Sequence, residues 1–111
     1  MEVEYTTTKL RKRLTDPQEM VKNFGVDKAK RLKQRLEELQ SISTLAELRN
    51  FPQANCHELK GDLKGFLALD LSRNWRLLFK PAHNPPPSKP DGGLDWCQVS
   101  KICIEAVEDY H

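Results

Sequence analysis

The spacing of apolar residues changes near the middle of this chain, and no other feature constrains the fold as strongly. Before position 51 the clearest pattern is helical, with apolar side chains sharing one helix face at Ala29, Leu32, Leu36 and Leu39. After position 52 apolar and polar residues alternate, as strands with one buried face do. Helices followed by consecutive strands predict an α+β fold, in which N-terminal helices pack on a mainly antiparallel sheet of three to four strands.

Residues that favour helix ends place the boundaries of the N-terminal helices. Asp16 and Pro17 are typical of an N-cap and a first helical position, and Gly25 is typical of a helix end. Asp27 is expected to cap the longest helix, which runs to Ile42. A further helix is expected over 8–14, and a short helical piece over 44–50.

The strands are expected at 2–5, where the sheet has an edge, and then at 66–72, 75–80 and 96–107. Trp75 and Phe79 share one strand face with Leu77, which favours a place in the core. Residues 1–111 have the length of a single domain. The segment 81–95 holds five prolines and two glycines, so it is expected to be an exposed inserted loop that folding does not require.

Charge is distributed unevenly along the chain. Residues 1–36 carry a balance of +5, from ten Lys/Arg and five Asp/Glu, and residues 37–111 carry −3, from eight and eleven. The basic side chains of the longest helix form either a solvated face or a contact surface for nucleic acid. The chain has no run of about 18 apolar residues and no signal-peptide pattern, so a cytoplasmic protein without a membrane association is expected.

The cysteines support neither a metal site nor a disulfide framework. Cys56, Cys97 and Cys103 are odd in number and lack the spacing of zinc ligands. We expect all of them to be buried, unreactive thiols.

Three segments hold candidate site residues: "CHELKGDLKG" at 56–65, "NWRLLF" at 74–79 and "EDYH" at 108–111. Glycine and lysine are ordinary in hairpin loops, and a lone histidine is more often a surface residue than a catalyst. A polar chain end usually frays. The apolar segment "KICIEAV" directly before it, however, predicts a strand that extends almost to the last residue, so a site built from the chain end is the alternative.

Taken together, the order H-x-L-K-G-D-x-K-G, W-R-[IL]-x-F and D-Y-H resembles the RelE/ParE superfamily of bacterial toxins, in particular its HigB-type (plasmid maintenance killer protein) subfamily. The resemblance covers about residues 42–111 and favours a site at the chain end over a frayed tail. The chain departs from the subfamily at Leu63, where arginine is frequent, and in the length of the loop 81–95.

The resemblance implies a toxin of a type II toxin-antitoxin system, with the RelE-like fold. Such a toxin is an endoribonuclease that cleaves mRNA in the 30S A site of the ribosome, uses no cofactor and is held inactive by a cognate helix-turn-helix antitoxin. The catalytic residues that the resemblance implies are His57, Lys60, Arg76, Asp109, Tyr110 and His111.

These residue types match the chemistry of RNA cleavage without a metal ion. The 2′-hydroxyl is then the nucleophile, so the protein supplies a base, an acid and cations for the phosphate. His57 and His111 are expected to be the proton carriers, and the α-carboxylate attached to His111 should favour its protonated form, which suits the acid. Lys60 and Arg76 are expected to stabilise the phosphate charge, and Tyr110 to stack on a base or donate a hydrogen bond.

Several assignments stay open at this stage. Asp109 either orients a histidine or a cation, or is a solvated carboxylate at a strand end. Basic residues that either contact the RNA backbone or are solvated are Lys64, Arg73, Lys80, Lys28, Arg31 and Arg35. The alternatives in function are a ParE-like toxin that binds gyrase without nuclease activity, and a degenerate toxin that serves as antitoxin partner and co-repressor.

Overall fold

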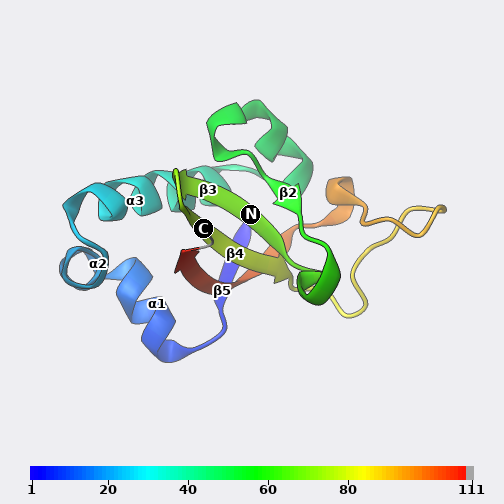
Figure 1. Ribbon diagram of the computed structural model, residues 1–111. Helices are drawn as coiled ribbons and strands as arrows, with labels where there is room; N and C mark the ends of the chain where they lie inside the picture. Colours follow the sequence, from blue (N-terminus) through cyan, green and yellow to red (C-terminus); the bar gives the residue numbers. More distant parts are fainter. Residues whose placement is uncertain (110–111) are drawn as a thin grey trace.

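A computed structural model of the chain describes residues 1–109 as a layer of helices on a mixed sheet (Figure 1). The strands are β1 (Glu2–Tyr5), β2 (His57–Glu58), β3 (Leu67–Ser72), β4 (Trp75–Pro81) and β5 (Lys101–Asp109). The α-helices are α1 (Thr8–Thr15), α2 (Pro17–Phe24) and α3 (Val26–Ser41). Short 3-10 helices cover Leu45–Asn50, Pro52–Ala54, Gly61–Leu63 and Trp96–Gln98.

The strand order in the described sheet is β1-β5-β4-β3-β2, with β1 parallel to β5 and every other pair antiparallel. The predicted α+β class with a mainly antiparallel sheet is confirmed. The sheet of the described residues has five strands, instead of three to four, because the two-residue β2 pairs with β3 and extends the sheet by one strand.

The core lies between α3 and one face of the sheet. Side chains with no exposed surface include Leu32 and Leu39 of α3, Leu69 of β3, and Leu77 and Phe79 of β4. Burying one such side chain contributes roughly 1.5–3 kcal/mol, so the apolar seam of α3 holds this helix on the sheet. The prediction that Phe79 lies in the core is confirmed, whereas Trp75 is half-buried at the edge of the core.

The helix starts follow the predicted caps in α2 but not in α3. Asp16 accepts a hydrogen bond of 3.0 Å from the Gln18 amide, and Pro17 occupies the first helical position. Gly25 has φ +82° and connects α2 directly to α3, which begins at Val26. Asp27 therefore lies in the first turn of α3 and is not its cap, because the glycine turn leaves no room for a linker.

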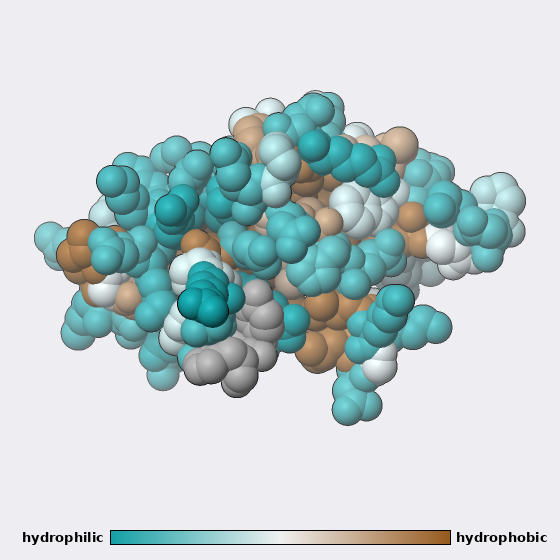
Figure 2. All heavy atoms as spheres, turned by 45° about the horizontal axis from the view of Figure 1, so that its top comes forward, coloured by the Kyte–Doolittle hydropathy of each residue, from teal (hydrophilic) through white to brown (hydrophobic). Residues whose placement is uncertain are grey.

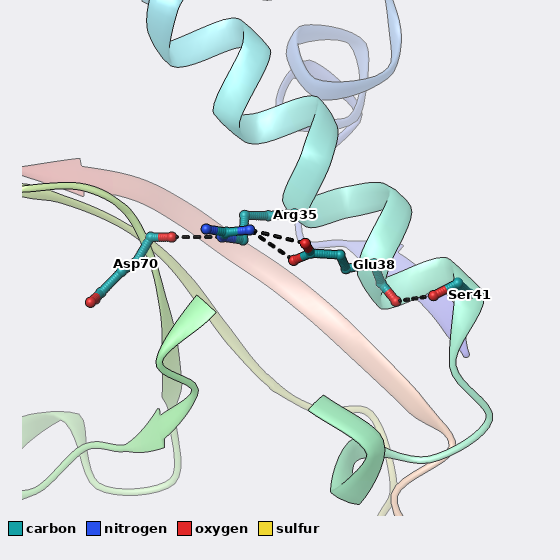
Figure 3. Close-up of polar contacts among 4 residues, drawn as sticks. All are labelled: Arg35, Glu38, Ser41 and Asp70. Carbon is teal, nitrogen blue, oxygen red and sulfur yellow. Dashed lines mark hydrogen bonds and ion pairs between the residues drawn. The ribbon is translucent and has the colours of Figure 1, made fainter. Parts of the chain in front are cut away.

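Arg35 lies on the buried side of α3, so the prediction that it contacts RNA is wrong (Figure 3). Its side chain is 3% exposed, and its Nη1 forms an ion pair of 2.9 Å with Glu38. Its Nε donates a hydrogen bond of 2.9 Å to the backbone carbonyl of Asp70 in β3. Helical spacing places Arg35 beside Leu32 and Leu39, facing the sheet, where the guanidinium satisfies a polar group of the strand.

The chain between β4 and β5 differs in detail from the prediction. Residues 96–98 form a 3-10 turn capped by Asp95, so the final strand begins at Lys101 and continues to Asp109. Cys97 in this turn is exposed, and the prediction that it is buried is wrong; Cys56 and Cys103 are half-buried, and the three thiols are free. No helix within residues 1–109 combines the length and the apolarity needed to cross a lipid bilayer.

Candidate active site

The candidate site lies on the sheet face opposite the helices, which we call the outer face. His57 of β2 pairs with Ala68 of β3, and Ala68 pairs with Leu78 of β4. Arg76 pairs with Asp70 on one side. Directly paired residues of antiparallel strands extend to the same side of the sheet, and residues two apart share a face. His57 and Arg76 therefore both lie on the outer face, opposite to Leu77 and Phe79.

Their separation follows from sheet geometry. His57 and Arg76 are separated by two strand spacings of about 4.8 Å each and by two residues along the strand, each of about 3.4 Å. Their backbones are therefore about 12 Å apart. Both residues are partly exposed. An imidazole and a long guanidinium at this separation can reach the two ends of one ribose-phosphate unit.

A turn before β2 fixes the ring of His57. The Nδ1 atom of His57 lies 2.7 Å from the backbone carbonyl oxygen of Asn55. A carbonyl oxygen only accepts hydrogen bonds, so Nδ1 carries the proton and Nε2 of the neutral ring carries the lone pair. Asn55 has φ +47°, the single described non-glycine residue with positive φ, and its Nδ2 donates a hydrogen bond of 3.0 Å to Oδ2 of Asp70.

Arg76 is held by the last strand. Its Nε donates a hydrogen bond of 2.6 Å to Oε1 of Glu108, which pairs with Arg76 in the register of β4 and β5. The two side chains are 15% and 33% exposed. Sequence reasoning missed Glu108 and Asn55, because the register that sets Glu108 opposite Arg76 and the left-handed turn at Asn55 are not visible in the sequence.

Lys60 and Lys64 are exposed and belong to the segment that connects β2 to β3. This segment and the inserted loop 81–95, which we call the Pro-rich loop, border a groove of about 680 Å³, which we call the loop groove. Figure 1 shows the two segments beside one another at the right of the sheet. Lys80, at the end of β4, forms an ion pair of 3.1 Å with Glu105, and its Nζ lies 6.0 Å from the centre of the Phe66 ring.

Other predicted site residues lie elsewhere. Asp109 pairs with Trp75, so it is on the helix side of the sheet and not on the outer face with Arg76. Lys28 lies over the ring of Trp75, with Nζ 4.2 Å from the ring centre. Arg31 of α3 and Arg73, in the turn between β3 and β4, are exposed. Tyr110 and His111 lie outside the described residues, so the predictions for the last two residues stay predictions.

The thiol nearest to the site is not a nucleophile. Burial raises the pKa of Cys56 to about 12, and the charge of Glu58 adds to this effect while Arg49 opposes it. Cys56 is therefore a neutral thiol at physiological pH. Within residues 1–109, no group of three or more His, Cys, Asp or Glu side chains is arranged to hold a metal ion.

A second hollow of about 530 Å³ lies between the helices, and we call it the helix groove. Its lining is largely apolar and includes Leu14, Met20, Val21, Val26, Ala29, Lys30, Lys33 and Leu36. Val21 is 43% and Val26 69% exposed. Figure 2 shows hydrophobic atoms at the surface on the left, where Figure 1 places the junction of α2 and α3.

Comparisons with known proteins place this geometry in context. The family model described as RelE-like toxin of type II toxin-antitoxin system HigB matches residues 6–85, which include His57, Lys60 and Arg76. No curated protein matches the chain. Among solved structures, the YoeB/ParE toxin from Agrobacterium tumefaciens aligns over 100% of both chains with a TM-score of 0.55 and 9% identity. At this identity the likeness shows a common fold and nothing more.

Proposed function

The chain belongs to the family of RelE-like toxins of type II toxin-antitoxin systems, HigB, and we propose that it is an endoribonuclease that cleaves mRNA on the ribosome without a metal ion. Membership of this family implies an antitoxin partner. The proposal adds the chemistry, the mRNA substrate, the 30S A site as the place of cleavage, a helix-turn-helix fold for the antitoxin and a cytoplasmic location.

One observation carries the proposal: a histidine with a fixed tautomer shares the outer face of the sheet with an arginine. In the neutral ring of His57, Nε2 carries the lone pair, because Nδ1 keeps the proton and donates a hydrogen bond to the Asn55 carbonyl. The Nε2 atom of His57 is therefore able to accept the proton of a ribose 2′-hydroxyl. The 2′-oxygen then attacks the adjacent phosphorus, a 2′,3′-cyclic phosphate forms, and the bond to the 5′-oxygen breaks.

Arg76 and Lys60 stabilise the negative charge that builds on the phosphate oxygens during this step. The guanidinium of Arg76 is kept in place by Glu108, so little reorganisation is needed when the phosphate arrives. The leaving 5′-oxygen takes a proton from an acid, a role for which we propose His111. Tyr110 is proposed to stack on a base, and Lys64, Arg73 and Lys80 to contact the RNA backbone.

Asp109 and the α3 residues Lys28 and Arg31 lie away from the outer face. Asp109 lies on the helix side of the sheet, so we propose it as a residue that orients the chain end and not as a group that touches the phosphate. Arg31 is exposed on α3 and is proposed to contact ribosomal RNA. Lys28 lies over Trp75, and an RNA contact would exchange part of this cation-π interaction for one with a phosphate.

We assign the helix groove to the antitoxin. An apolar groove with Val21 and Val26 exposed fits an amphipathic segment. Among the described residues, two lysines, Lys30 and Lys33, line it with a single carboxylate, Glu37, so the charge balance favours acidic residues in this segment. The variant Val26→Asp is expected to weaken binding of the cognate antitoxin at least tenfold, because it places a carboxylate on the apolar surface. Lys22→Ala, exposed on α2 but outside the groove, is the control, and equal antitoxin affinity of both variants would refute this assignment.

The proposal is tested by expressing the protein without its antitoxin and mapping the 5′ ends of cellular RNA. We expect growth arrest and new ends within translated coding regions, and neither with His57→Gln. His83→Gln is the control, since His83 belongs to the Pro-rich loop, where it accepts a hydrogen bond from the Ser100 amide. Growth arrest with intact mRNA and DNA damage would support the gyrase-binding alternative, and no arrest would support the degenerate toxin.

A further inference from the structure

The Pro-rich loop is a fixed wall of the loop groove. Ser88 and Leu94 form an isolated β-bridge, and the Lys89 amide donates a hydrogen bond of 2.7 Å to the Gly93 carbonyl. The Asp95 amide donates to the Pro87 carbonyl at 2.9 Å, which closes the base of the loop. These bonds make the loop a small hairpin of its own.

The end of this hairpin is tied to the strand that carries His57. Nε1 of Trp96 donates a hydrogen bond of 3.1 Å to Oε2 of Glu58, the residue next to His57 in β2. The guanidinium of Arg49 lies over the Trp96 ring, with Cζ 4.9 Å from the ring centre. The wall of the loop groove is thus held in place relative to the outer face.

The opposite wall of the loop groove is basic and aromatic. Lys60 and Lys64 are exposed on it, and the single carboxylate among the lining residues, Glu58, is already bonded to Trp96. Phe66 is half-buried and lines the groove, yet it does not belong to the apolar side chains that pack on the core. A phenyl ring beside two ammonium groups has the composition of surfaces that bind single-stranded nucleic acid.

The loop groove adjoins the candidate active site. Lys60 follows His57 by three residues, which span at most about 10 Å in an extended chain. The groove is also lined by Leu67 at the start of β3 and Pro81 at the end of β4, so it lies at that end of the sheet. An RNA strand with its cleaved phosphate between His57 and Arg76 would enter this groove with the next nucleotides.

We propose that the loop groove binds the single-stranded RNA that flanks the cleavage position, an inference that rests on the proposed endoribonuclease function. Lys64 contacts a flanking phosphate, beyond the cleaved phosphate that Lys60 contacts, and Phe66 stacks on one base. The apolar surface of Pro86, Pro87 and Leu94 covers the opposite side of this nucleotide. The inserted hairpin is then a device for substrate binding, and an acidic peptide is the competing occupant.

The test measures RNA affinity and not cleavage, so that it is independent of the catalytic proposal. A short fluorescent single-stranded RNA is titrated with full-length His57→Gln protein at several salt concentrations, and its anisotropy is recorded. Adding Lys64→Ala is expected to reduce the slope of log Kd against log salt by about 0.7, the contribution of one phosphate contact. Adding Phe66→Leu is expected to raise Kd about fivefold or more, the loss of one stacked base.

Lys89→Ala is the matched control. Lys89 is an exposed cation of the Pro-rich loop that pairs with Asp91 and does not line the groove. It is expected to leave the Kd within twofold and the slope unchanged. If Lys64→Ala and Phe66→Leu bind RNA as this control does, the inference is overturned even when the parent protein cleaves mRNA. Groove-dependent RNA binding by a protein that never cleaves RNA would support the inference and contradict the proposed function alone. An acidic peptide that binds there while RNA does not would overturn it too.

Discussion

Replacing Asn55 tests whether this residue positions His57 for catalysis, because the replacement is expected to change activity much more than the stability of the fold. Asn55→Gly keeps a residue that adopts φ +47° without strain and keeps the backbone carbonyl, but it removes the 3.0 Å hydrogen bond to Asp70. That bond is exposed and contributes about 0.5–1.5 kcal/mol. Relief of the left-handed strain, about 1 kcal/mol, offsets most of this loss, so the free energy of unfolding is expected to change by less than about 1 kcal/mol.

Activity is expected to respond far more strongly than stability. Without the bond to Asp70 the turn is free to move, and the Asn55 carbonyl no longer holds Nδ1 of His57. A displacement of about 1 Å of a catalytic group costs up to about 10²-fold in rate, so we expect cleavage by Asn55→Gly to fall between about 10-fold and 100-fold. Asn55→Ala should lose activity equally and about 1–2 kcal/mol of stability, because alanine is strained at this φ.

The assay combines the cleavage rate with nitrogen NMR of the histidine rings, which reports the tautomer directly. The parent is expected to show His57 protonated at Nδ1 when neutral, and Asn55→Gly a mixture of tautomers. Asn23→Ala, an exposed asparagine of α2, is the control for both measurements. A parent ring protonated at Nε2, or an Asn55→Gly protein with parent tautomer and full activity, would refute the positioning role.

Three further predictions address the fold. Arg35→Ala should lower the free energy of unfolding in urea by about 3 kcal/mol, since it strands the partner Glu38 and the Asp70 carbonyl; a loss no larger than that of exposed Arg31→Ala would contradict the buried role. At pH 8, iodoacetamide should modify Cys97 well before Cys56, whose raised pKa of about 12 keeps it protonated, and equal labelling of the native protein would contradict this; denatured protein is the control for intrinsic reactivity. Replacing residues 84–92 by a two-residue turn should change the Tm by only a few degrees, because Leu94 and Trp96, which pack on the core, are retained; loss of folding would show that the loop supports the core.

The sequence predicted the fold class because the helical and the alternating spacing are both formed mainly by leucines, which strongly prefer to be buried. The leucines of α3 and the alternating leucines of β3 are buried as their spacing indicates. The same spacing puts position 35 on the helix face that meets the sheet, but it does not decide whether a long cation stays there or turns to solvent, because that depends on a partner. Only the contact between α3 and the Asp70 carbonyl decides this.

The main residues of the candidate site were predictable from the sequence, but the residues that hold them in place were not. His57, Lys60 and Arg76 were found from motifs, whereas Asn55 and Glu108 act through tertiary geometry. Asn55 depends on a left-handed turn, and Glu108 depends on the register between β4 and β5. Asp109 illustrates the same limit, since a bulge between Leu78 and Phe79 shifts the pairing and thereby sets the face on which each residue of β5 lies.

The chemical ends of the cleaved RNA test the central claim most directly. Attack by the 2′-oxygen leaves a 2′,3′-cyclic phosphate upstream and a 5′-hydroxyl downstream, whereas hydrolysis by a metal-activated water most often leaves a 5′-phosphate. RNA from cells that express the protein without antitoxin is ligated to an adapter with and without prior treatment by a polynucleotide kinase. We predict that the new ends are captured only after the kinase and are absent with His57→Gln. New ends that are captured without the kinase would contradict the account.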